Sequence, residues 1–359
     1  MNSKWEYRKI GDVCIVERGG SPRPIDQYIT NDANGINWIK IGDTSESMYI
    51  TETAQKIKPE GMKKSRYVQP GDFLLSNSMS FGRPYILKTD GCIHDGWLVL
   101  RDKNSFFDKR FLYYYLSAKP TYEKFKMIAV GGVVNNLNSE MVRKISVPVP
   151  CKAEQIEIAN LLDIVNRIIL KRKQTLQKLD ELVKARFVEM FGDRYVNDKN
   201  WNTTKLGNSI SFNNGKAHEQ IVDENGEYIL VTSRAIASNF KDVRRTNELL
   251  SPLRKDDIVM VMSDVPNGRA LAKCQLIKDN NKYTLNQRIC SFDNYNYNPV
   301  FLLFLLSRHP YFLSFNDGNG QTNLRKNDIL DCELIDPPIE LQEQFADFVS
   351  QVDKSKAVA

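Results

Sequence analysis

The chain has 359 residues, 42% of them hydrophobic and 26% charged, so it is long enough for two or three globular domains that each bury a core. Its net charge of +6 at pH 7 is compatible with a polyanionic partner but does not identify one. Its six cysteines form no Cys-x-x-Cys pair and no leader or membrane-length apolar run occurs, which predicts a cytoplasmic protein rather than a zinc ribbon, a disulfide framework or a membrane protein.

The first 150 residues alternate short β-type runs with Gly, Pro, Asn and Asp turns. Branched and aromatic residues predict strands at 36–41, 73–76, 84–88 and 97–100. An amphipathic helix is expected at 108–118, where Pro120 should end it, and a polar loop with two glycines follows at 131–137. These patterns predict an α+β domain.

The middle of the chain, at 154–191, has the pattern of one long helix. Pro150 precedes it, Gly192 follows it, and neither residue type interrupts it, so it would extend roughly 55 Å. Its apolar residues recur at mostly three- and four-residue steps, at Ile158, Leu161, Val165, Ile168, Leu176, Leu179, Val183 and Met190. A stripe this narrow favours a coiled-coil seam, and the alternative is a long core helix of a larger domain.

The second half of the chain repeats this plan. Strands are expected at 228–231, 258–262, 272–277 and 288–292. A helix at 300–308 precedes Pro310, a polar loop lies at 318–324, and the chain closes with a second, shorter helix of about 15 residues.

Six sequence blocks recur in the same order in the two halves, about 190 residues apart. For example, 5–12 matches 201–208, 111–120 matches 301–310, and Gln155 matches Gln342. Chance similarity does not keep its order over six blocks, so we infer a tandem duplication of one α+β domain followed by one helix. The expected boundaries are 1–150 for the first domain, 151–195 for the long helix, 196–338 for the second domain and 339–359 for the short helix.

The short helix would cover only the far end of the long one, near 176–190, if the two run antiparallel. Part of the apolar stripe would then need a cover from another chain, either a helix of a partner protein or a second copy of this protein. The interface candidates are Ile158, Leu161, Val165 and Ile168 on the long helix and Phe345 and Phe348 on the short one.

Two related domains joined by a rigid helix suit an extended partner with two sites at a fixed separation, and duplex DNA is the obvious candidate. The layout resembles the specificity subunit of type I restriction–modification systems over nearly the whole chain. The resemblance rests on short blocks: Trp5 with Lys9-Ile-Gly-Asp12 and its copy, Pro70-Gly-Asp-Phe73, the Phe111 helix and its copy, Gly320-Gln-Thr-Asn-Leu324, and Val147-Pro-Val-Pro150 before Glu154-Gln155.

The resemblance implies two target recognition domains, each of which reads one half of a split DNA sequence, spaced by antiparallel helices. Two modification (methyltransferase) subunits would dock on those helices and bring S-adenosylmethionine, and restriction (motor-nuclease) subunits would join them. The chain itself would be neither a catalyst nor a cofactor-binding protein.

Base reading calls for Arg, Lys, Asn, Gln, Ser and Thr on loops and strand ends, and phosphate contacts need cations and backbone N–H groups. Each candidate has a structural alternative, such as a hairpin turn, a helix cap or a half-buried strand. The candidates in the first half are Arg18, Gly20, Ser21, Lys40, Ser76, Asn77, Ser80, Arg83, Asn135 and Asn136. Those in the second half are Lys216, Arg234, Ser263, Asn267, Arg269, Asn286, Gln287, Arg288, Gln321, Thr322 and Asn323.

Other interpretations have less support. Tyr113 to Tyr115 could stack on bases, but their apolar copies favour core packing, and Lys171 to Lys173 could contact DNA or form a solvated face. Asp336-Pro-Pro-Ile339 resembles the Asp-Pro-Pro-aromatic loop of adenine methyltransferases, but Ile replaces the aromatic ring and no Gly-rich cofactor turn accompanies it. The three histidines have no metal-ligand spacing, so no metal is expected.

The alternatives left open are a free-standing DNA adenine methyltransferase and an assembly scaffold that does not contact DNA.

Overall fold

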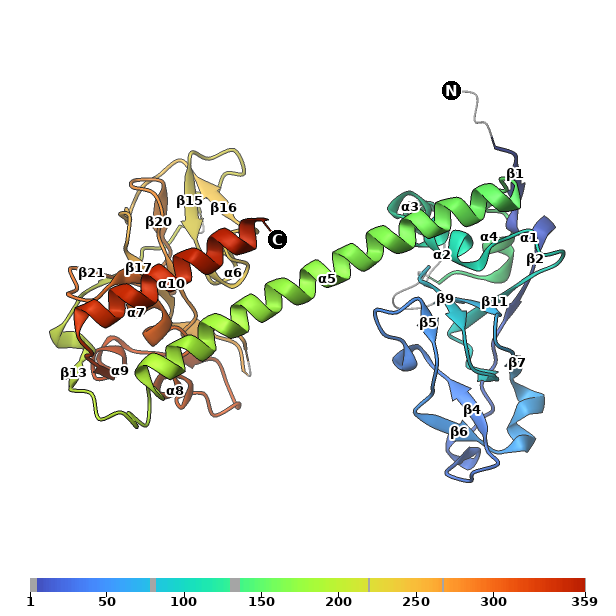
Figure 1. Cartoon of the computed structure of the whole chain (residues 1–359), viewed down its shortest axis with the longest axis horizontal. Coiled ribbons are helices and arrows are strands. Elements are labelled where there is room, and N and C mark those ends of the chain that lie inside the picture. Colours follow the sequence, from blue (N-terminus) through green and yellow to red (C-terminus); the bar gives the residue numbers. More distant parts are fainter. Residues whose placement is uncertain (1–4, 78–81, 130–135, 219, 267, 359) are drawn as a thin grey trace. The chain divides into compact units, whose positions relative to one another are not determined.

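The computed structural model describes residues 5–77, 82–129, 136–218, 220–266 and 268–358 (Figure 1). The chain divides into two compact units, unit 1 (Met1–Leu170) and unit 2 (Lys171–Ala359). Both mix strands with helices, which confirms the predicted α+β class.

Unit 1 is built on two five-stranded sheets, of order β2-β11-β8-β9-β5 and β3-β6-β4-β10-β7, and a two-stranded sheet of β1 and β12. The strands are β1 (Tyr7–Lys9), β2 (Cys14–Arg18), β3 (Ile29–Thr30), β4 (Ile36–Ile39), β5 (Tyr49–Ile50), β6 (Gln55–Ile57), β7 (Arg66–Val68), β8 (Phe73–Ser76), β9 (Pro84–Leu87), β10 (Gly91–Ile93), β11 (Trp97–Asp102) and β12 (Ser146–Pro148). The helices are α1 (Ile10–Val13), α2 (Lys109–Ser117), α3 (Lys119–Ala129) and α4 (Ser139–Arg143), with 3-10 turns η1 (Ile25–Gln27), η2 (Ile41–Asp43) and η3 (Pro59–Lys64).

The central strands of unit 1 are buried on both faces, which explains their uninterrupted apolar sequences. Leu98 and Leu100 of β11 pack with Phe111 of α2 in one hydrophobic cluster. Val99 lies between them in sequence and packs with Ile39 of the other sheet in a second cluster. Because successive side chains on a strand point to opposite faces, β11 is enclosed between the helices and the second sheet.

The sequence led us to expect that Pro120 ends the helix, but helical structure continues past this residue. Helix α2 stops at Ser117, and α3 begins at Lys119 with Pro120 in its first turn. A proline is tolerated there because the first-turn N–H groups have no helical partner. Pro310 likewise begins α8 (Pro310–Leu313) in unit 2.

Unit 2 contains sheets of order β14-β21-β17-β19 and β16-β15-β20 and two-stranded pairs β18-β22 and β13-β23. The strands are β13 (Thr203–Lys205), β14 (Ser211–Asn214), β15 (Tyr228–Val231), β16 (Arg244–Thr246), β17 (Ile258–Val261), β18 (Ser263–Asp264), β19 (Cys274–Leu276), β20 (Tyr283–Leu285), β21 (Ile289–Asp293), β22 (Thr322–Asn323) and β23 (Glu333–Ile335). The helices are α6 (Ser233–Ala237), α7 (Pro299–Leu306), α8, α9 (Lys326–Leu330) and α10 (Ile339–Val358), with one 3-10 turn, η4 (Leu206–Asn208).

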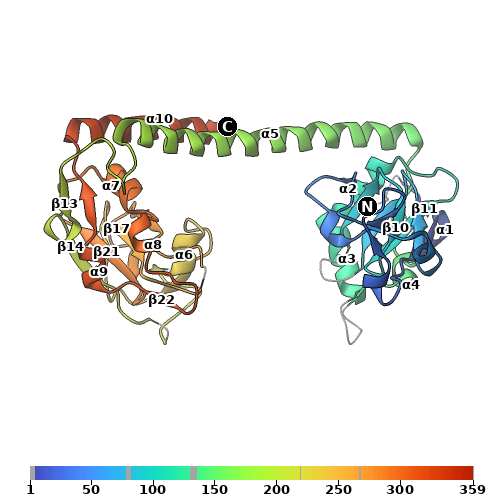
Figure 2. The same cartoon turned by 90° about the horizontal axis from the view of Figure 1, so that it is seen from below.

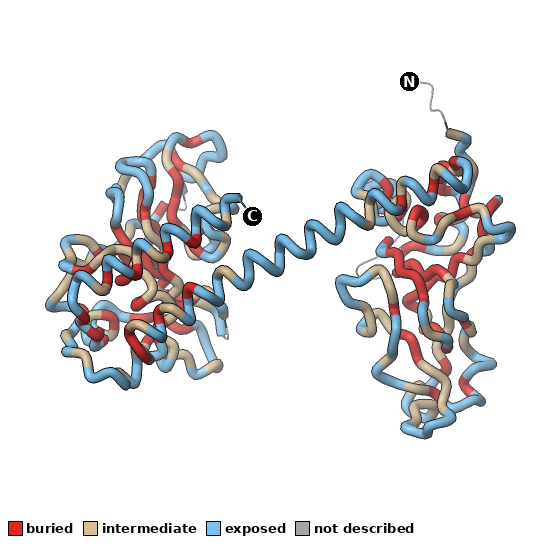
Figure 3. Tube along the Cα trace, in the orientation of Figure 1, coloured by how far each residue is buried: buried red, intermediate tan, exposed pale blue. Residues whose placement is uncertain are grey.

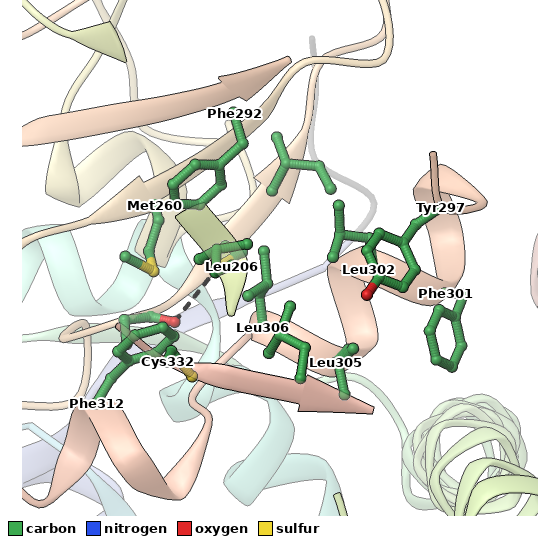
Figure 4. Packing of buried hydrophobic residues seen from close by; sticks show 14 of the residues in the cluster. Leu206, Met260, Phe292, Tyr297, Phe301, Leu302, Leu305, Leu306, Phe312 and Cys332 are labelled. Carbon is green, nitrogen blue, oxygen red and sulfur yellow. Dashed lines mark hydrogen bonds between the residues drawn. The ribbon is translucent and has the colours of Figure 1, made fainter. Parts of the chain in front are cut away.

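Helix α7 is the centre of the core of unit 2. Phe301, Leu302, Leu305 and Leu306 are all buried in one cluster with residues of the sheet and of η4 (Figure 4). The N–H of Leu206 in η4 donates to the carbonyl of Cys332 at 2.8 Å and ties this turn to the start of β23.

The two units attach their following helices by the same hydrogen bonds. In unit 1, Gln155 Oε1 accepts from the N–H of Asp108 at 2.8 Å, and Gln155 Nε2 donates to the carbonyl of Pro150 at 2.9 Å. In unit 2, Gln342 Oε1 accepts from the N–H of Asn298 at 2.9 Å, and Gln342 Nε2 donates to the carbonyl of Pro337 at 2.8 Å. Asp108 and Asn298 also cap α2 and α7, so the duplication inferred from sequence extends to individual contacts.

The long helix α5 (Lys152–Phe191) has 40 residues without a break. Helix α10 has 20 residues and runs antiparallel to the end of α5 that lies in unit 2 (Figure 2). Phe345 near the start of α10 stacks edge-on against Phe191, whereas Lys356 near its end forms an ion pair with Asp180 at 2.8 Å. Among the described residues, no helix is apolar over enough of its length to cross a membrane.

Candidate nucleic-acid interface

In unit 1, residues from separate stretches meet at the turn between β10 and β11. Arg18 Nε donates to the carbonyl of Asp95 at 3.1 Å, and Asn77 Nδ2 donates to the same carbonyl at 2.8 Å. Ser21 Oγ donates to Asp95 Oδ1 at 2.8 Å. The fold therefore gathers three of the predicted DNA contacts around one aspartate.

Asp95 was not among the predicted contacts. The hydrogen bond from Ser21 is the main cause that lowers the pKa of Asp95, while partial burial opposes it. The carboxylate is therefore ionised at neutral pH and can only accept hydrogen bonds. Arg23 lies 3.6 Å from its Oδ2. Asp95 holds the position in the first half of the chain that Gln287, a predicted contact, holds in the second half. Extending the alignment of the two halves to this turn could have identified it.

The stretch that begins at Ser76 is placed largely inside the fold. The side chains of Ser76 and Asn77 are buried, and Ser76 Oγ accepts from the N–H of Arg83 at 3.0 Å. These two residues therefore shape the loop, and Arg83 is exposed among the described residues of the stretch. Within the described part of the chain, no carboxylate lies within ion-pair distance of Arg83. Ser80 lies outside the described residues.

Gly20 lies beside the turn between β10 and β11, and Asn136 precedes a residue that is hydrogen-bonded to Asn77. The N–H of Gly20 donates to the carbonyl of Ile93 at 3.2 Å, and a Cβ atom at Gly20 would lie 3.0 Å from the carbonyl oxygen of Lys64. Asn136 is exposed, and the next residue, Leu137, donates its N–H to the carbonyl of Asn77 at 2.9 Å. Asn135 lies outside the described residues.

Lys40 and Arg234 follow equivalent strands, as the sequence indicated. Strand β4 pairs in parallel with β10, and β15 pairs in parallel with β20. Lys40 therefore follows a strand that ends beside the turn between β10 and β11, and Arg234 follows one that ends beside the turn between β20 and β21. Lys40 Nζ donates to Gln55 Oε1 at 2.7 Å, and Arg234 Nε lies 3.7 Å from Asp242 Oδ2. Each cation is thus already paired with a neighbour in its own unit.

Unit 2 gathers its candidates at the corresponding end of its sheet. Strand β18 pairs with β22 and places Ser263 opposite Asn323, and Gln321 Nε2 donates to Ser263 Oγ at 2.6 Å. Lys216 forms a β-bridge with Asn286. Candidates from four stretches of the sequence therefore belong to two connected groups. Ser263 and Thr322 are buried in the first group, and Asn286 is buried in the second.

Four of the exposed candidate contacts of unit 2 are cations, namely Lys216, Arg234, Arg269 and Arg288. Lys216, Gln287 and Arg288 are exposed, as is Arg269, whose carbonyl accepts from Arg308 Nη1 at 2.9 Å. No described carboxylate lies within ion-pair distance of Lys216, Arg269 or Arg288. Asn267 lies outside the described residues.

The predicted interface residues on the helices divide into exposed and buried sets. The side chains of Leu161, Val165 and Ile168 are 62%, 44% and 51% exposed, and Figure 3 shows the middle of α5 as exposed. Ile158 is partly buried against the core of unit 1. Phe345, by contrast, has no exposed surface: it lies in the core of unit 2 and is not available to another chain.

Phe348 is intermediate between these sets. Its ring is partly buried, and the guanidinium of Arg186 lies 5.8 Å from the ring centroid. A cation over an aromatic face adds about 0.5–1 kcal/mol at a partly exposed site. Phe348 therefore closes the edge of the contact between α10 and α5.

The tyrosines after Arg110 are used to attach helices. Tyr114 Oη donates to Asp163 Oδ1 on α5 at 2.7 Å, and Tyr115 Oη donates to the carbonyl of Ser146 at 3.2 Å. Burial is the main cause that raises the pKa of Tyr114, and the Asp163 carboxylate adds to it. These contacts give Tyr114 and Tyr115 a structural role, so base stacking is not needed to explain them.

His309 is buried in unit 2, close to the partly buried Arg194. Arg194 donates to the carbonyls of Phe304, Leu305 and Arg308 at the end of α7, the last two at 3.0 Å. Burial, to which the nearby Arg194 cation adds, lowers the pKa of His309 to about 4. Across the part of the chain that the structure describes, no three His, Cys, Asp or Glu side chains gather in a way that could hold a metal ion.

Comparisons with known proteins agree with this architecture. The family described as "Type I restriction modification DNA specificity domain" matches residues 2–181 and again residues 198–358. Two relatives from Methanocaldococcus jannaschii are the type I restriction enzyme MjaIX specificity subunit, 25% identical over 59% of this chain and 52% of the relative, and the MjaVIII specificity subunit, 21% identical over 56% and 45%. The chain thus spans about half the length of the curated relatives it matches.

Two solved structures have a similar fold. One belongs to a study of complex assembly and conformational transition of a type I R-M system, with a TM-score of 0.60 and 13% identity over 100% of this chain and 92% of that one. The other is the S subunit of a type I restriction–modification system from M. genitalium, with a TM-score of 0.55 and 14% identity over 99% of this chain and 91% of that one.

Proposed function

The chain belongs to the family of type I restriction–modification DNA specificity domains, and we propose that it is the sequence-reading subunit of such a system. Each unit would bind one half of a split target in double-stranded DNA. The observation that carries this proposal is the repetition of one loop cluster, rich in Arg, Lys, Asn, Gln and Ser, at the same end of the sheet in both units.

The composition of the two clusters suits the chemistry of DNA. Exposed Arg83, Lys216, Arg269 and Arg288 would contact phosphates or guanine edges, since no described carboxylate neutralises them. The buried Ser76 and Asn77 would hold the loops in place. A rigid loop loses little conformational entropy on binding and therefore favours specific recognition.

The chemistry would be supplied by other subunits. We propose that two modification subunits bring S-adenosylmethionine and methylate adenine, and that restriction subunits join the assembly, all in the cytoplasm, where the DNA is. The exposed apolar side chains of Leu161, Val165 and Ile168 would be covered by a methyltransferase helix. A second copy of this chain is the alternative cover.

The proposal is tested by methylome sequencing of cells that carry this chain with its methyltransferase subunits. The expected result is a split motif with a methylated adenine in each half. Arg83→Ala should weaken methylation that depends on one half, and Arg269→Ala should weaken methylation that depends on the other. A motif that is unsplit, or two variants that affect both halves equally, would contradict reading by separate units.

Lys103→Ala is the matched control in unit 1. Lys103 follows the end of β11 opposite to the Asp95 turn, and its Nζ donates to the carbonyl of Gly11 at 2.8 Å. The variant removes one positive charge, as Arg83→Ala does, but at the other end of the strand. Methylation should therefore stay at the wild-type level.

The two alternatives predict different observations. A free-standing adenine methyltransferase would bind S-adenosylmethionine as the purified chain, which calorimetry measures. An assembly scaffold would give a complex whose DNA affinity does not depend on this chain. We expect no cofactor binding by the chain alone and DNA binding by the complex that falls steeply as salt rises.

A further inference from the structure

The turns at residues 94–96 and 286–288 occupy equivalent backbone positions in the two units. Both are anchored by five matching backbone hydrogen bonds. In unit 1 these are Gly19 N to Trp97 O (2.9 Å), Gly20 N to Ile93 O (3.2 Å), His94 N to Ile39 O (3.3 Å), Trp97 N to His94 O (3.1 Å) and Asn77 N to Gly96 O (3.0 Å). In unit 2 they are Gly215 N to Ile289 O (3.2 Å), Lys216 N to Leu285 O (3.0 Å), Asn286 N to Val231 O (3.2 Å), Ile289 N to Asn286 O (3.0 Å) and Met262 N to Arg288 O (3.1 Å).

A glycine contacts each turn closely from the neighbouring strand. A Cβ atom at Gly19 would lie 2.2 Å from the carbonyl oxygen of His94, and a Cβ atom at Gly215 would lie 2.0 Å from that of Asn286. Neither position can hold a larger residue without moving the turn. The backbone of the two turns is therefore fixed in the same way.

The first side chain of each turn has the same internal role. His94 Nδ1 accepts from the N–H of Gly96 at 2.6 Å, and Asn286 Oδ1 accepts from the N–H of Arg288 at 3.4 Å. The second and third positions differ in chemistry between the units. Unit 1 has Asp95 and a glycine, whereas unit 2 has Gln287 and Arg288, both exposed.

We infer that these two turns are the equivalent base-reading elements of the units, and that their second and third residues make the two half-sites different. The inference rests on the proposed function and names the residues that set its specificity. Arg288 offers a guanidinium that matches the O6 and N7 acceptors of guanine, and Gln287 offers an amide that suits adenine. Asp95 offers only acceptors, which select the exocyclic amino group of cytosine or adenine.

The contacts of Asp95 support this assignment over a phosphate contact. A carboxylate repels phosphates, yet Asp95 is held at the centre of a cluster that includes Arg18, Ser21 and Asn77. The cations Arg18 and Arg23 beside it would balance its charge at the DNA surface. A base amino group is the DNA feature that a carboxylate in this place can bind.

The steric environment of Gly96 allows the turns to be exchanged as a set. A Cβ atom at Gly96 would lie 2.1 Å from Cε1 of His94, and the other two nearest atoms, at 2.8 and 3.2 Å, also belong to that ring. Replacing His94 by Asn removes the ring and keeps a side-chain acceptor for the N–H of residue 96. We therefore expect His94→Asn/Asp95→Gln/Gly96→Arg to fold, whereas Gly96→Arg alone would be strained.

The test is methylome sequencing of cells that carry the full-length chain with its own methyltransferase subunits. The triple variant should change the preferred base in one half of the motif and leave the other half unchanged. Arg288→Gln, a change at an exposed residue, should relax a guanine in the half that the triple variant leaves unchanged. One lost bidentate contact corresponds to a fall in preference of roughly 5- to 150-fold at that position.

An unchanged motif in Arg288→Gln, or both variants altering the same half, would overturn the inference. An unchanged motif in a triple variant that still supports methylation would also overturn it. If the triple variant does not fold, Asp95→Asn and Arg288→Gln decide: the inference requires each to alter a different half. Failure of the proposed function is a distinct result, because the wild-type chain would then give no split motif at all.

Discussion

Replacing Phe345 by Ala should detach α10 from the core of unit 2. The ring of Phe345 is fully buried, and its centroid lies 5.4 Å from that of Phe187, 5.8 Å from Phe191 and 5.2 Å from Phe304. Three elements, α5, α7 and α10, therefore meet at this one side chain. Truncating a fully buried phenylalanine costs about 3–5 kcal/mol through lost burial and the cavity that remains.

Phe348→Ala is the matched control on the same helix. Its ring is partly exposed, so its truncation removes less buried area and one contact with Arg186. The expected cost is about 1 kcal/mol. The two variants remove the same atoms three residues apart, and only their burial differs.

Native-state hydrogen exchange followed by mass spectrometry measures the effect locally. Phe345→Ala should lower the opening free energy of peptides from α10 and α7 by about 3 kcal/mol or more, and Phe348→Ala should lower it by about 1 kcal/mol. Peptides from β11 in unit 1 serve as the internal reference and should not change. Equal effects of the two variants, or unchanged protection of α10 in Phe345→Ala, would refute the assignment of Phe345 to the core.

Three further predictions concern the partly buried cation, the buried histidine and the exposed stripe. Arg194→Met removes a guanidinium that donates to three carbonyls at the end of α7, so it should lower the stability of unit 2 by about 2–3 kcal/mol in urea unfolding; a neutral result would contradict this capping role. Because the folded-state pKa of His309 is lowered to about 4, its contribution to stability is present above about pH 6.5 and is lost as the pH falls toward 4. Between pH 7 and pH 5 the loss should be about 2 kcal/mol, and His309→Asn, which keeps a helix-capping acceptor, should remove that part of the pH dependence; the same pH dependence in both proteins would contradict it. Leu161→Asp should reduce co-purification of methyltransferase subunits. Because this side chain is 62% exposed, the melting temperature of the chain should not change. Asn166→Asp, at an exposed residue of the same helix, is the control and should leave co-purification unchanged.

The local elements of this protein could be predicted from sequence because their residues carry the signal themselves. The strand expected at 73–76 is β8, and the helix expected at 154–191 is α5, which starts two residues earlier. Apolar periodicity and the flanking Pro and Gly are local properties, so they identify elements without knowledge of the fold. The order of the repeated blocks likewise revealed the duplication and the family.

Residues that act through distant contacts could not be predicted in the same way. Asp95 stands in an ordinary turn, and its importance arises from Arg18, Ser21 and Asn77, which are far from it in sequence. Phe345 lies on an apolar helix face that suits either an external partner or an internal core. Its burial depends on where α7 and α5 meet, which no local pattern encodes.

The sequence by itself thus determined the two α+β units, the long helix between them in the chain and the family, because periodicity, turn residues and repeated order are written along the chain. Only the tertiary structure decided which candidates are buried, as Ser76 and Phe345 are, and which are presented to solvent, as Arg83 and Arg288 are. Burial is a property of what packs against a residue, and the partners here come from distant segments, as Phe187 and Phe345 do, which are 158 residues apart along the chain.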